Sequence, residues 1–223
     1  MVDFQAARRA MVDGQVRTND VTHLGLIAAM LDIPREAFVP EGRAALAYLD
    51  RDVAIADATA AEPARYLMKP VVLARLIQAV DPGPRDRVLV LGAGSGYAAA
   101  VLSRLAGAVV ALEPNVGLAQ KAGSVLSALG CDNVTVIRGT LADGAPASGP
   151  YDVILIDGGV EIVPEALCGQ LSARGRLVAV VGAGPVGKAT LSQAVNGKFS
   201  GRMLFDANAP VLPGLSVAPA FVF

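Results

Sequence analysis

Short apolar runs alternate with longer segments of helical periodicity over the second half of the chain, from Arg87 onward. The apolar runs have the length of buried strands, and they predict strands over residues 88–91, 108–112, 133–137, 151–157 and 175–181. The segments between them predict helices over about 96–105, 115–129 and 161–171. Because such alternation builds βαβ units, the sequence predicts an α/β fold with a doubly wound, mostly parallel sheet.

The pattern changes near the end of the chain. Residues 189–195 and 198–205 flank the pair Asn196-Gly197, which is typical of a tight two-residue hairpin turn. We therefore expect an antiparallel hairpin to complete the otherwise parallel sheet.

The first part of the chain predicts helices. Apolar residues recur at helical spacing over residues 3–48, and residues 69–80 predict a further amphipathic helix. Residues 50–64 show no clear period and are expected to form a loop. Asp81-Pro82-Gly83-Pro84 ends the last of these helices and marks a boundary. We expect a helical extension over residues 1–81 and the sheet domain over residues 82–223, together one compact unit.

A glycine-rich turn carries the strongest functional signal. The predicted strand Val88-Leu89-Val90-Leu91 leads into Gly92-Ala93-Gly94-Ser95-Gly96-Tyr97, where a helix is expected to begin. Glycines there permit positive φ and close approach of a ligand, and the start of a helix offers free N–H groups to an anionic group. Glu113 follows the next predicted strand, where an acid can accept hydrogen bonds from both hydroxyls of a ribose. The sequence therefore predicts a site for an adenosine-containing cofactor.

The spacing of the glycines discriminates between cofactors. A nicotinamide dinucleotide motif has the form Gly-x-Gly-x-x-Gly, but its sixth position is Tyr97 in this chain. The compact Gly92–Gly96 spacing favours S-adenosylmethionine, which has no pyrophosphate. A dinucleotide, or a glycine turn with no ligand, remains an alternative from the motif alone.

Composition narrows the function classes. Hydrophobic residues make up 53% of the 223 residues and charged residues 17%, so a large core built from Val, Leu, Ile and Ala is expected. The net charge of −1 argues against a nucleic-acid partner or an anionic membrane surface. No apolar run predicts a membrane span. Cys131 and Cys168 have no metal-ligand spacing and are expected to be buried, reduced thiols in the cytoplasm. The single histidine, His23, is expected on a helix surface or in packing, and no metal site is predicted.

A second glycine motif, Gly182-Ala-Gly-Pro-Val-Gly187-Lys188, has the spacing of a phosphate-binding loop. The position that needs Ser or Thr for Mg²⁺ is Ala189, and Pro185 lacks a backbone N–H. We interpret this segment as a turn between the last parallel strand and the hairpin.

Further motifs stand in order along the chain: Arg8-x-x-Met11-Val12-x-x-Gln15-Val16, Ala29-Met30, Pro34-Arg35-x-x-Phe38-Val39-Pro40, Tyr151-Asp152-Val153-Ile154, Pro164-Glu165-Ala166-Leu167-x-x-Gln170-Leu171 and Gly175-Arg176-Leu177-Val178. Together with the glycine turn and its Tyr97, they resemble the protein-L-isoaspartate O-methyltransferase family along nearly the full chain.

The resemblance implies a Rossmann-like class I methyltransferase fold, with the helical extension on the substrate side. It also implies methyl transfer from S-adenosylmethionine to the free carboxylate of isoaspartyl residues in damaged proteins. An unperturbed carboxylate, with a pKa near ~4, is ionised at neutral pH. The reaction then needs alignment of donor and acceptor rather than a catalytic base. The oligomeric state is not predicted.

Site residues follow from the same resemblance. The cofactor is expected to contact Gly92, Ala93, Gly94, Ser95, Gly96, Tyr97, Glu113, Pro114, Thr140, Leu141 and Asp157. The acceptor is expected to contact Arg65, Tyr66, Met68 and Val211, with Tyr66 and Asp157 as catalytic candidates.

The acceptor half departs from the family pattern. The family places Gly-Gln-Thr-Ile-Ser before the proline that corresponds to Pro70, and this chain reads Ala64-Arg65-Tyr66-Leu67-Met68. Tyr66 and Met68 therefore replace the hydroxyl residues that help to hold the acceptor carboxylate, and Thr140 stands where the family has an acid facing adenine. Two alternatives follow: a methyltransferase for another carboxylate or small molecule, or a non-catalytic cofactor-binding relative.

Overall fold

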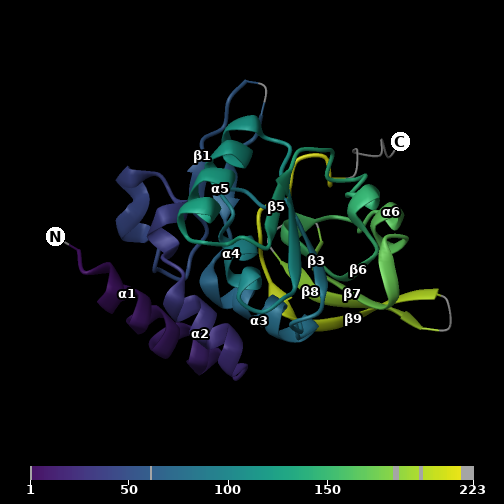
Figure 1. Cartoon of the computed structure of the whole chain (residues 1–223), viewed down its shortest axis with the longest axis horizontal. Helices are drawn as coiled ribbons and strands as arrows, with labels where there is room; N and C mark the ends of the chain where they lie inside the picture. The colour runs from purple at the N-terminus through teal and green to yellow at the C-terminus, as the bar shows by residue number, and fades with distance from the viewer. Residues whose placement is uncertain (1, 61, 183–185, 196–197, 217–223) are drawn as a thin grey trace.

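The computed structural model describes all residues except 1, 61, 183–185, 196–197 and 217–223. Its centre is a seven-stranded sheet in the order β5-β4-β3-β6-β7-β8-β9 (Figure 1). The strands are β3 (Arg87–Leu91), β4 (Ala108–Leu112), β5 (Val134–Ile137), β6 (Tyr151–Val160), β7 (Leu171–Val181), β8 (Gly187–Val195) and β9 (Lys198–Ala207). The first five pair in parallel, and β8 and β9 pair antiparallel. The α/β fold predicted from the sequence is thus confirmed. The turn Asn196-Gly197 and residues 183–185 of the second glycine motif lie outside the described residues.

Alternate residues of the central strands line two cores, because successive side chains of a strand point to opposite faces. Val88, Val90 and Val153 belong to the core covered by α3 (Pro70–Val80), α4 (Tyr97–Ser103) and α5 (Val116–Ala128). Leu89, Leu91 and Ile154 belong to the second core, which includes residues of the 209–215 segment and Leu167 of the short helix α6 (Glu165–Cys168). Burial on both faces explains why these strands read as continuous apolar runs.

The N-terminal part is helical, as predicted. It comprises α1 (Phe4–Met11), a π-helical turn (Val12–Val16), α2 (Leu24–Asp32) and short 3₁₀ turns at Arg17–Asn19, Arg35–Phe38 and Glu41–Leu46. Its buried residues join the same core as α3, α4 and the sheet. No helix in the described part of the chain is long and apolar enough to cross a membrane.

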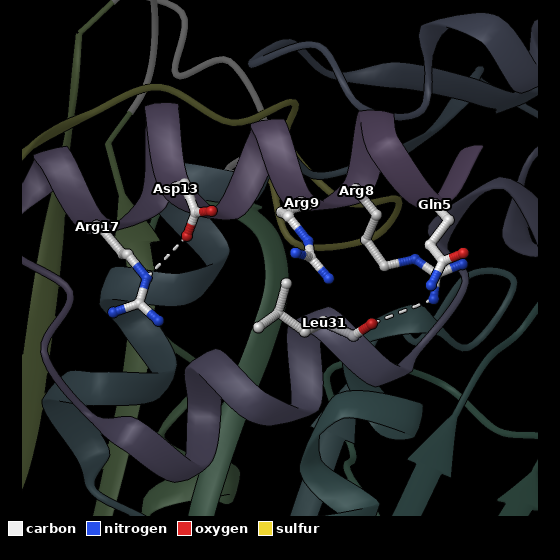
Figure 2. Close-up of a pocket in the computed structure, with 6 residues that line it drawn as sticks. All are labelled: Gln5, Arg8, Arg9, Asp13, Arg17 and Leu31. Atoms are coloured by element: carbon white, nitrogen blue, oxygen red, sulfur yellow. Dashed lines mark hydrogen bonds and ion pairs between the residues drawn. The ribbon is translucent and has the colours of Figure 1, made fainter. Parts of the chain in front are cut away.

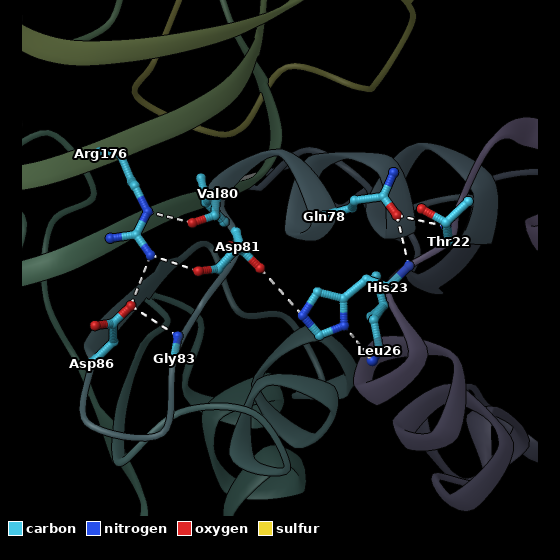
Figure 3. Close-up of polar contacts among 9 residues, drawn as sticks. All are labelled: Thr22, His23, Leu26, Gln78, Val80, Asp81, Gly83, Asp86 and Arg176. Carbon is cyan, nitrogen blue, oxygen red and sulfur yellow. Dashed lines mark hydrogen bonds and ion pairs between the residues drawn. The ribbon is translucent and has the colours of Figure 1, made fainter.

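Hydrogen bonds and an ion pair connect the predicted boundary at Asp81-Pro82-Gly83-Pro84 to its neighbours (Figure 3). Arg176 on β7 donates to the Val80 and Asp81 carbonyls and forms a 2.8 Å ion pair with Asp86. On the other side, Gln78 Oε1 accepts hydrogen bonds from the backbone N–H groups of Thr22 and His23. These contacts tie the end of α3 to both the sheet and the start of α2.

His23 has a structural place. Its Nδ1 accepts a hydrogen bond from the Leu26 N–H at 2.9 Å and so caps α2, and its Nε2 lies 3.4 Å from Asp81 Oδ1. Cys131 is buried and Cys168 is half-buried, so the expectation of burial is wrong for Cys168; both are free thiols.

Two expectations about secondary structure are wrong. Residues 50–64 are not entirely loop, because β1 (Val53–Ala56) pairs antiparallel with β2 (Arg65–Leu67) in a separate two-stranded sheet. Residues 161–171 are not one helix: α6 has only four residues, between Pro164 and Gly169, and β7 already begins at Leu171. Gln170 stabilises the connection between α6 and β7, since its side-chain amide donates hydrogen bonds to the carbonyls of Asp143 and Ala166.

Asp50 is exposed and Asp52 is half-buried, and both carboxylates bind backbone donors near the start of α3. Asp52 Oδ1 accepts a hydrogen bond from the Lys69 N–H at 2.8 Å, and Asp50 Oδ1 accepts one from the Val71 N–H at 3.2 Å. Both carboxylates thereby satisfy donors at the start of α3, where acidic groups are favourable.

Candidate functional site

The glycine turn lies at the carboxyl end of β3, as predicted. Gly92, Gly94 and Gly96 have φ of +77°, +56° and +100°, values that favour glycine. The N–H groups of Gly92 and Ala93 both donate to the Leu112 carbonyl, at 2.9 and 3.1 Å. The turn is therefore pinned to the end of the neighbouring strand β4, next to Glu113.

Two residues of the motif pack inward. Ser95 is fully buried and its hydroxyl donates to the Phe38 carbonyl. Tyr97 is fully buried, with its ring 5.5 Å from that of Phe38 and the Arg35 guanidinium 4.6 Å from its centroid. Both side chains fasten the N-terminal part to the turn.

Glu113 is fully buried at the end of β4 and is surrounded by donors. Its Oε1 accepts from Arg65 Nη1 at 2.6 Å and from the Asn115 N–H at 3.0 Å. Its Oε2 accepts from Arg65 Nη2 at 2.9 Å and from the Gly94 N–H at 2.7 Å. A carboxylate offers about four acceptor sites. The residue expected to bind ribose thus has its hydrogen-bonding capacity filled by the chain itself.

Apolar side chains cover the glycines. A Cβ placed on Gly92 would lie 2.5 Å from Leu212 Cδ1, and one on Gly158 would lie 2.5 Å from Leu212 Cγ. A Cβ on Gly94 would lie 2.8 Å from Ile55 Cδ1. The space that glycine leaves at these three positions is therefore occupied by Leu212 and Ile55.

The side expected to face adenine is open. Pro114, Thr140 and Leu141 line a surface groove of about 460 Å³ together with Arg138, Gly139, Pro213 and Gly214. Thr140 is exposed, while Leu141 is buried at the base and belongs to the second core. A smaller hollow of about 160 Å³, lined by Arg65, Asn115 and Glu62, shares Pro114 and Pro213 with this groove.

The residues expected to contact the acceptor do come together. Arg65, Tyr66, Met68 and Val211 line one hollow with Asp157, Gly158 and Leu212. Its free volume is about 10 Å³, which is the space of roughly one water. Met68 is buried, whereas Tyr66 is 39% exposed. The residues expected to contact the acceptor thus lie together, but the hollow between them is too small to hold an acceptor group.

Asp157 ends up in a buried charged cluster. Burial raises the pKa of its carboxyl to about 7, against the opposing effect of the Arg35 and Arg65 charges. Its Oδ1 has no hydrogen-bond partner, and the same holds for the buried Arg35 Nη1 and Tyr97 hydroxyl. Arg35 itself donates to the carbonyls of Ala47 at 2.7 Å and Met68 at 2.5 Å, and burial lowers its pKa.

Sequence reasoning missed three participants: Leu212, Ile55 and Arg35. Leu212 and Ile55 are aliphatic residues outside any periodic segment, so no chemical signal marked them. Arg35 is followed directly by Glu36, as in an exposed polar pair, so its burial is not evident from the local sequence.

Another hollow, of about 270 Å³, lies away from the glycine turn between α1 and α2 and is lined by three arginines (Figure 2). Arg8 donates to the Leu31 and Asp32 carbonyls and pairs with Glu36, and Arg17 pairs with Asp13 at 3.0 Å. Arg8 and Arg17 thus make contacts within the N-terminal part. Among the described residues no group of three or more His, Cys, Asp or Glu is placed to hold a metal ion.

Comparison with known proteins assigns the family. The model of the family described as protein-L-isoaspartate(D-aspartate) O-methyltransferase matches residues 7–206. A protein-L-isoaspartate O-methyltransferase of Pelotomaculum thermopropionicum is 41% identical over 175 residues, which are 78% of this chain and 74% of that protein. Another, of Rhodopseudomonas palustris, is 44% identical over 173 residues, covering 78% and 77%. This chain belongs to the protein-L-isoaspartate O-methyltransferase family. The family is a class of methyltransferases that use S-adenosylmethionine.

Solved structures agree on the fold of this family member. A protein-L-isoaspartate O-methyltransferase superposes with a TM-score of 0.80 at 26% identity, covering 93% of this chain and 66% of that one. A putative protein-L-isoaspartate O-methyltransferase of Plasmodium falciparum, crystallised with S-adenosylhomocysteine, gives a TM-score of 0.74 at 18% identity, covering 95% and 99%.

S-adenosylmethionine does not fit into the site in this conformation. The glycine turn, Glu113 and Thr140 follow the carboxyl ends of β3, β4 and β5. However, Arg65 takes the acceptor sites of Glu113, and Leu212 fills the space over Gly92 and Gly158. The adenine side is open and the side toward the acceptor is closed by the protein's own side chains.

Proposed function

We propose that this protein methylates the carboxylate of isoaspartyl residues in damaged proteins or peptides, with S-adenosylmethionine as the methyl donor. The family match over residues 7–206 supports the reaction class. The observation that carries the proposal is the placement of the Gly92–Tyr97 turn and Glu113 at the carboxyl ends of the adjacent strands β3 and β4. Ligands of doubly wound sheets bind at this edge.

The proposed acceptor contacts are Arg65 and Tyr66. Met68 is buried and its thioether cannot donate a hydrogen bond to a carboxylate. The Tyr66 hydroxyl can donate one, and a guanidinium can bind a carboxylate through two parallel hydrogen bonds. Both residues lie on β2 and line the hollow beside Asp157. Arg65 and Tyr66 would thus take over the role of the two hydroxyl residues, whose positions are those of Tyr66 and Met68 in this chain.

The chemistry makes light demands on this chain. A solvent-exposed acceptor carboxylate is ionised at neutral pH and needs no base to become a nucleophile. The only histidine, His23, lies at the start of α2 and is engaged with Leu26 and Asp81. A site without a free imidazole suits a carboxylate acceptor better than an amine or alcohol that must lose a proton.

A second candidate is methylation of a different carboxylate by the same site. The loss of both hydroxyl residues and the closed hollow of about 10 Å³ favour this alternative, because the acceptor contacts differ from the family pattern.

The cytoplasm is the proposed compartment, supported by two free cysteines among the described residues.

Transfer of radiolabelled methyl groups to an isoaspartyl peptide tests the proposal, with the matching aspartyl peptide as control. Base-labile label on the isoaspartyl peptide alone is the expected result, because methyl esters hydrolyse in base. Label on neither peptide, from protein shown to be folded, would reject isoaspartyl methylation. Screening of small carboxylates would then separate another acceptor from a non-catalytic relative.

A further inference from the structure

The closure of the cofactor site is built from specific contacts. Arg65 and Glu113 are 5% and 0% exposed in their side chains, and two hydrogen bonds of 2.6 and 2.9 Å join them. Arg65 Nη2 also donates to the carbonyl of Gly92, within the glycine turn itself, at 3.3 Å. One guanidinium thus bonds to both the acid and the turn that the family pattern assigns to the cofactor.

The remaining acceptor sites of Glu113 are also filled. The N–H groups of Gly94 and Asn115 take one site on each oxygen, so four donors face about four acceptor positions. The two backbone donors belong to the turn and to the start of α5, and they can stay when a ligand binds. The other two donors, Nη1 and Nη2, both belong to the side chain of Arg65. A ribose can therefore reach Glu113 only in exchange for Arg65.

Leu212 closes the second half of the site. Its side chain lies against Gly92 on β3's turn and Gly158 on β6, so it bridges the ends of two adjacent strands. Leu212 is 5% exposed and belongs to the second core. Displacement of the Leu212 side chain would expose the backbone of Gly92 and Gly158, which a ligand could then approach closely.

Both closing elements are peripheral to the main sheet. Arg65 lies on β2, which pairs with β1 in a separate sheet of two strands. Leu212 lies in an irregular segment that follows β9 and is joined to β6 through the bridge between Gly159 and Val211. Displacement of these two side chains would open the site without breaking the pairing of β3 with β4 or β6, and without breaking the backbone hydrogen bonds that join Pro210 and Leu212 to Gly159.

We propose that this structure is a self-closed form of the protein, in which Arg65 competes with the cofactor's ribose for Glu113 and Leu212 occupies the adjacent space. Cofactor binding then requires that both side chains leave. The inference rests on the proposed function for the identity of the ligand. It deepens that function, because the release of Arg65 from Glu113 also frees the guanidinium that the proposed acceptor contact needs.

Calorimetric titration with S-adenosylhomocysteine tests the closure without any methyl transfer. The variants are Arg65→Gln, which carries the residue of the family pattern, and Leu212→Ala. The matched control is Arg17→Gln, which removes an exposed ion pair with Asp13 on the N-terminal helices. We expect Arg65→Gln to bind at least ten-fold tighter than the natural protein, and Leu212→Ala also to bind tighter. Arg17→Gln should bind as the natural protein does.

A folded Arg65→Gln variant that binds no tighter than the natural protein would overturn the proposal. If this variant does not fold, Leu212→Ala decides by the same criterion. A second readout is the increase in melting temperature on addition of the ligand, which should be larger for the opened variants. Binding that tightens while no variant methylates an isoaspartyl peptide would uphold the closure and reject the proposed acceptor, so the two failures are distinguishable.

Discussion

Arg65 and Glu113, which are 48 positions apart in the sequence, form an ion pair that is almost wholly shielded from water. The pair links the small β1–β2 sheet to the carboxyl end of β4. A buried ion pair adds little stability compared with apolar residues, because both charges lose their hydration. Removal of one partner is nevertheless costly, since it leaves the other charge buried and uncompensated.

Glu113→Gln is therefore expected to lower the free energy of unfolding by about 3–5 kcal/mol. The loss has two parts: Arg65 keeps its charge without a counter-ion, and a neutral amide accepts fewer of the four hydrogen bonds. The double variant Arg65→Met/Glu113→Gln should lose less than the sum of the two single changes. Urea denaturation of the four proteins measures this coupling. Strict additivity would show that the two side chains do not interact in solution.

Asp157 gives a dependence of stability on pH. Burial raises the pKa of its carboxyl to about 7, although Arg35 and Arg65 lower it; Glu113 and Asp52 add to the rise. A carboxyl with a higher pKa in the folded than in the unfolded state stabilises the fold below its ordinary pKa, and this contribution is lost as the pH rises to about 7.

Asp157→Asn, which stays neutral, should therefore gain stability relative to the natural protein between about pH 4 and 7 and hold the gain above that. The gain is on the order of 4 kcal/mol at the alkaline plateau, since the pKa rises from 3.8 to about 7 and one pKa unit corresponds to about 1.4 kcal/mol. Urea denaturation at several pH values measures it. A difference that is the same at pH 4 and pH 8 would place the pKa of Asp157 near its ordinary value.

The sequence predicted the parts of the fold that rest on local pattern. Strands β3, β4 and β6 are buried on both faces and read as apolar runs, and the turn after β3 needs glycine at three positions of positive φ. Strand β1 was not predicted, because its alternation of apolar residues extends over only four residues and its pairing with β2 spans a loop. Pro164 and Gly169 shortened the helix that the periodicity of 161–171 suggested.

The sequence predicted which residues gather at the candidate site, but it did not predict which of them contact one another. Its residues gather at one edge because parallel strands end there, which the order of elements already implies. The pairing of Arg65 with Glu113 depends on where β2 lies relative to β4, and the position of Leu212 depends on how an irregular segment returns to β6. Neither follows from local periodicity, so whether the site is open or closed could not be predicted.

Gly158→Ala tests the packing of Leu212 against the sheet. The new methyl group would lie 2.5 Å from Leu212 Cγ, so the leucine has to move. Overpacking of this kind costs about 1–3 kcal/mol. In the Leu212→Ala background the same change should cost less, because the clash is gone. Thermal unfolding of the two single variants and the double variant gives the coupling, and an equal cost in both backgrounds would mean that Leu212 does not cover Gly158.

Substitution of Arg35 tests the buried charged cluster around Asp157 through its cation instead of its acid. Its guanidinium lies 4.6 Å from the centroid of the Tyr97 ring and donates to the carbonyls of Ala47 and Met68. Arg35→Met should lower the free energy of unfolding by about 3 kcal/mol or more, because two buried carbonyls lose donors and Asp157 loses a nearby cation. Arg35→Lys keeps the charge but has no planar fork, so a smaller loss is expected.

The pH profile separates a role in charge from a role in packing. Because the Arg35 charge lowers the pKa of Asp157, Arg35→Met should raise that pKa further, and the loss of stability with rising pH should extend to higher pH. Arg35→Lys should leave the profile near that of the natural protein. The measurement is urea denaturation of all three proteins between pH 4 and 9. An unchanged profile in a folded Arg35→Met variant would show that the arginine supports the site through packing and hydrogen bonds alone.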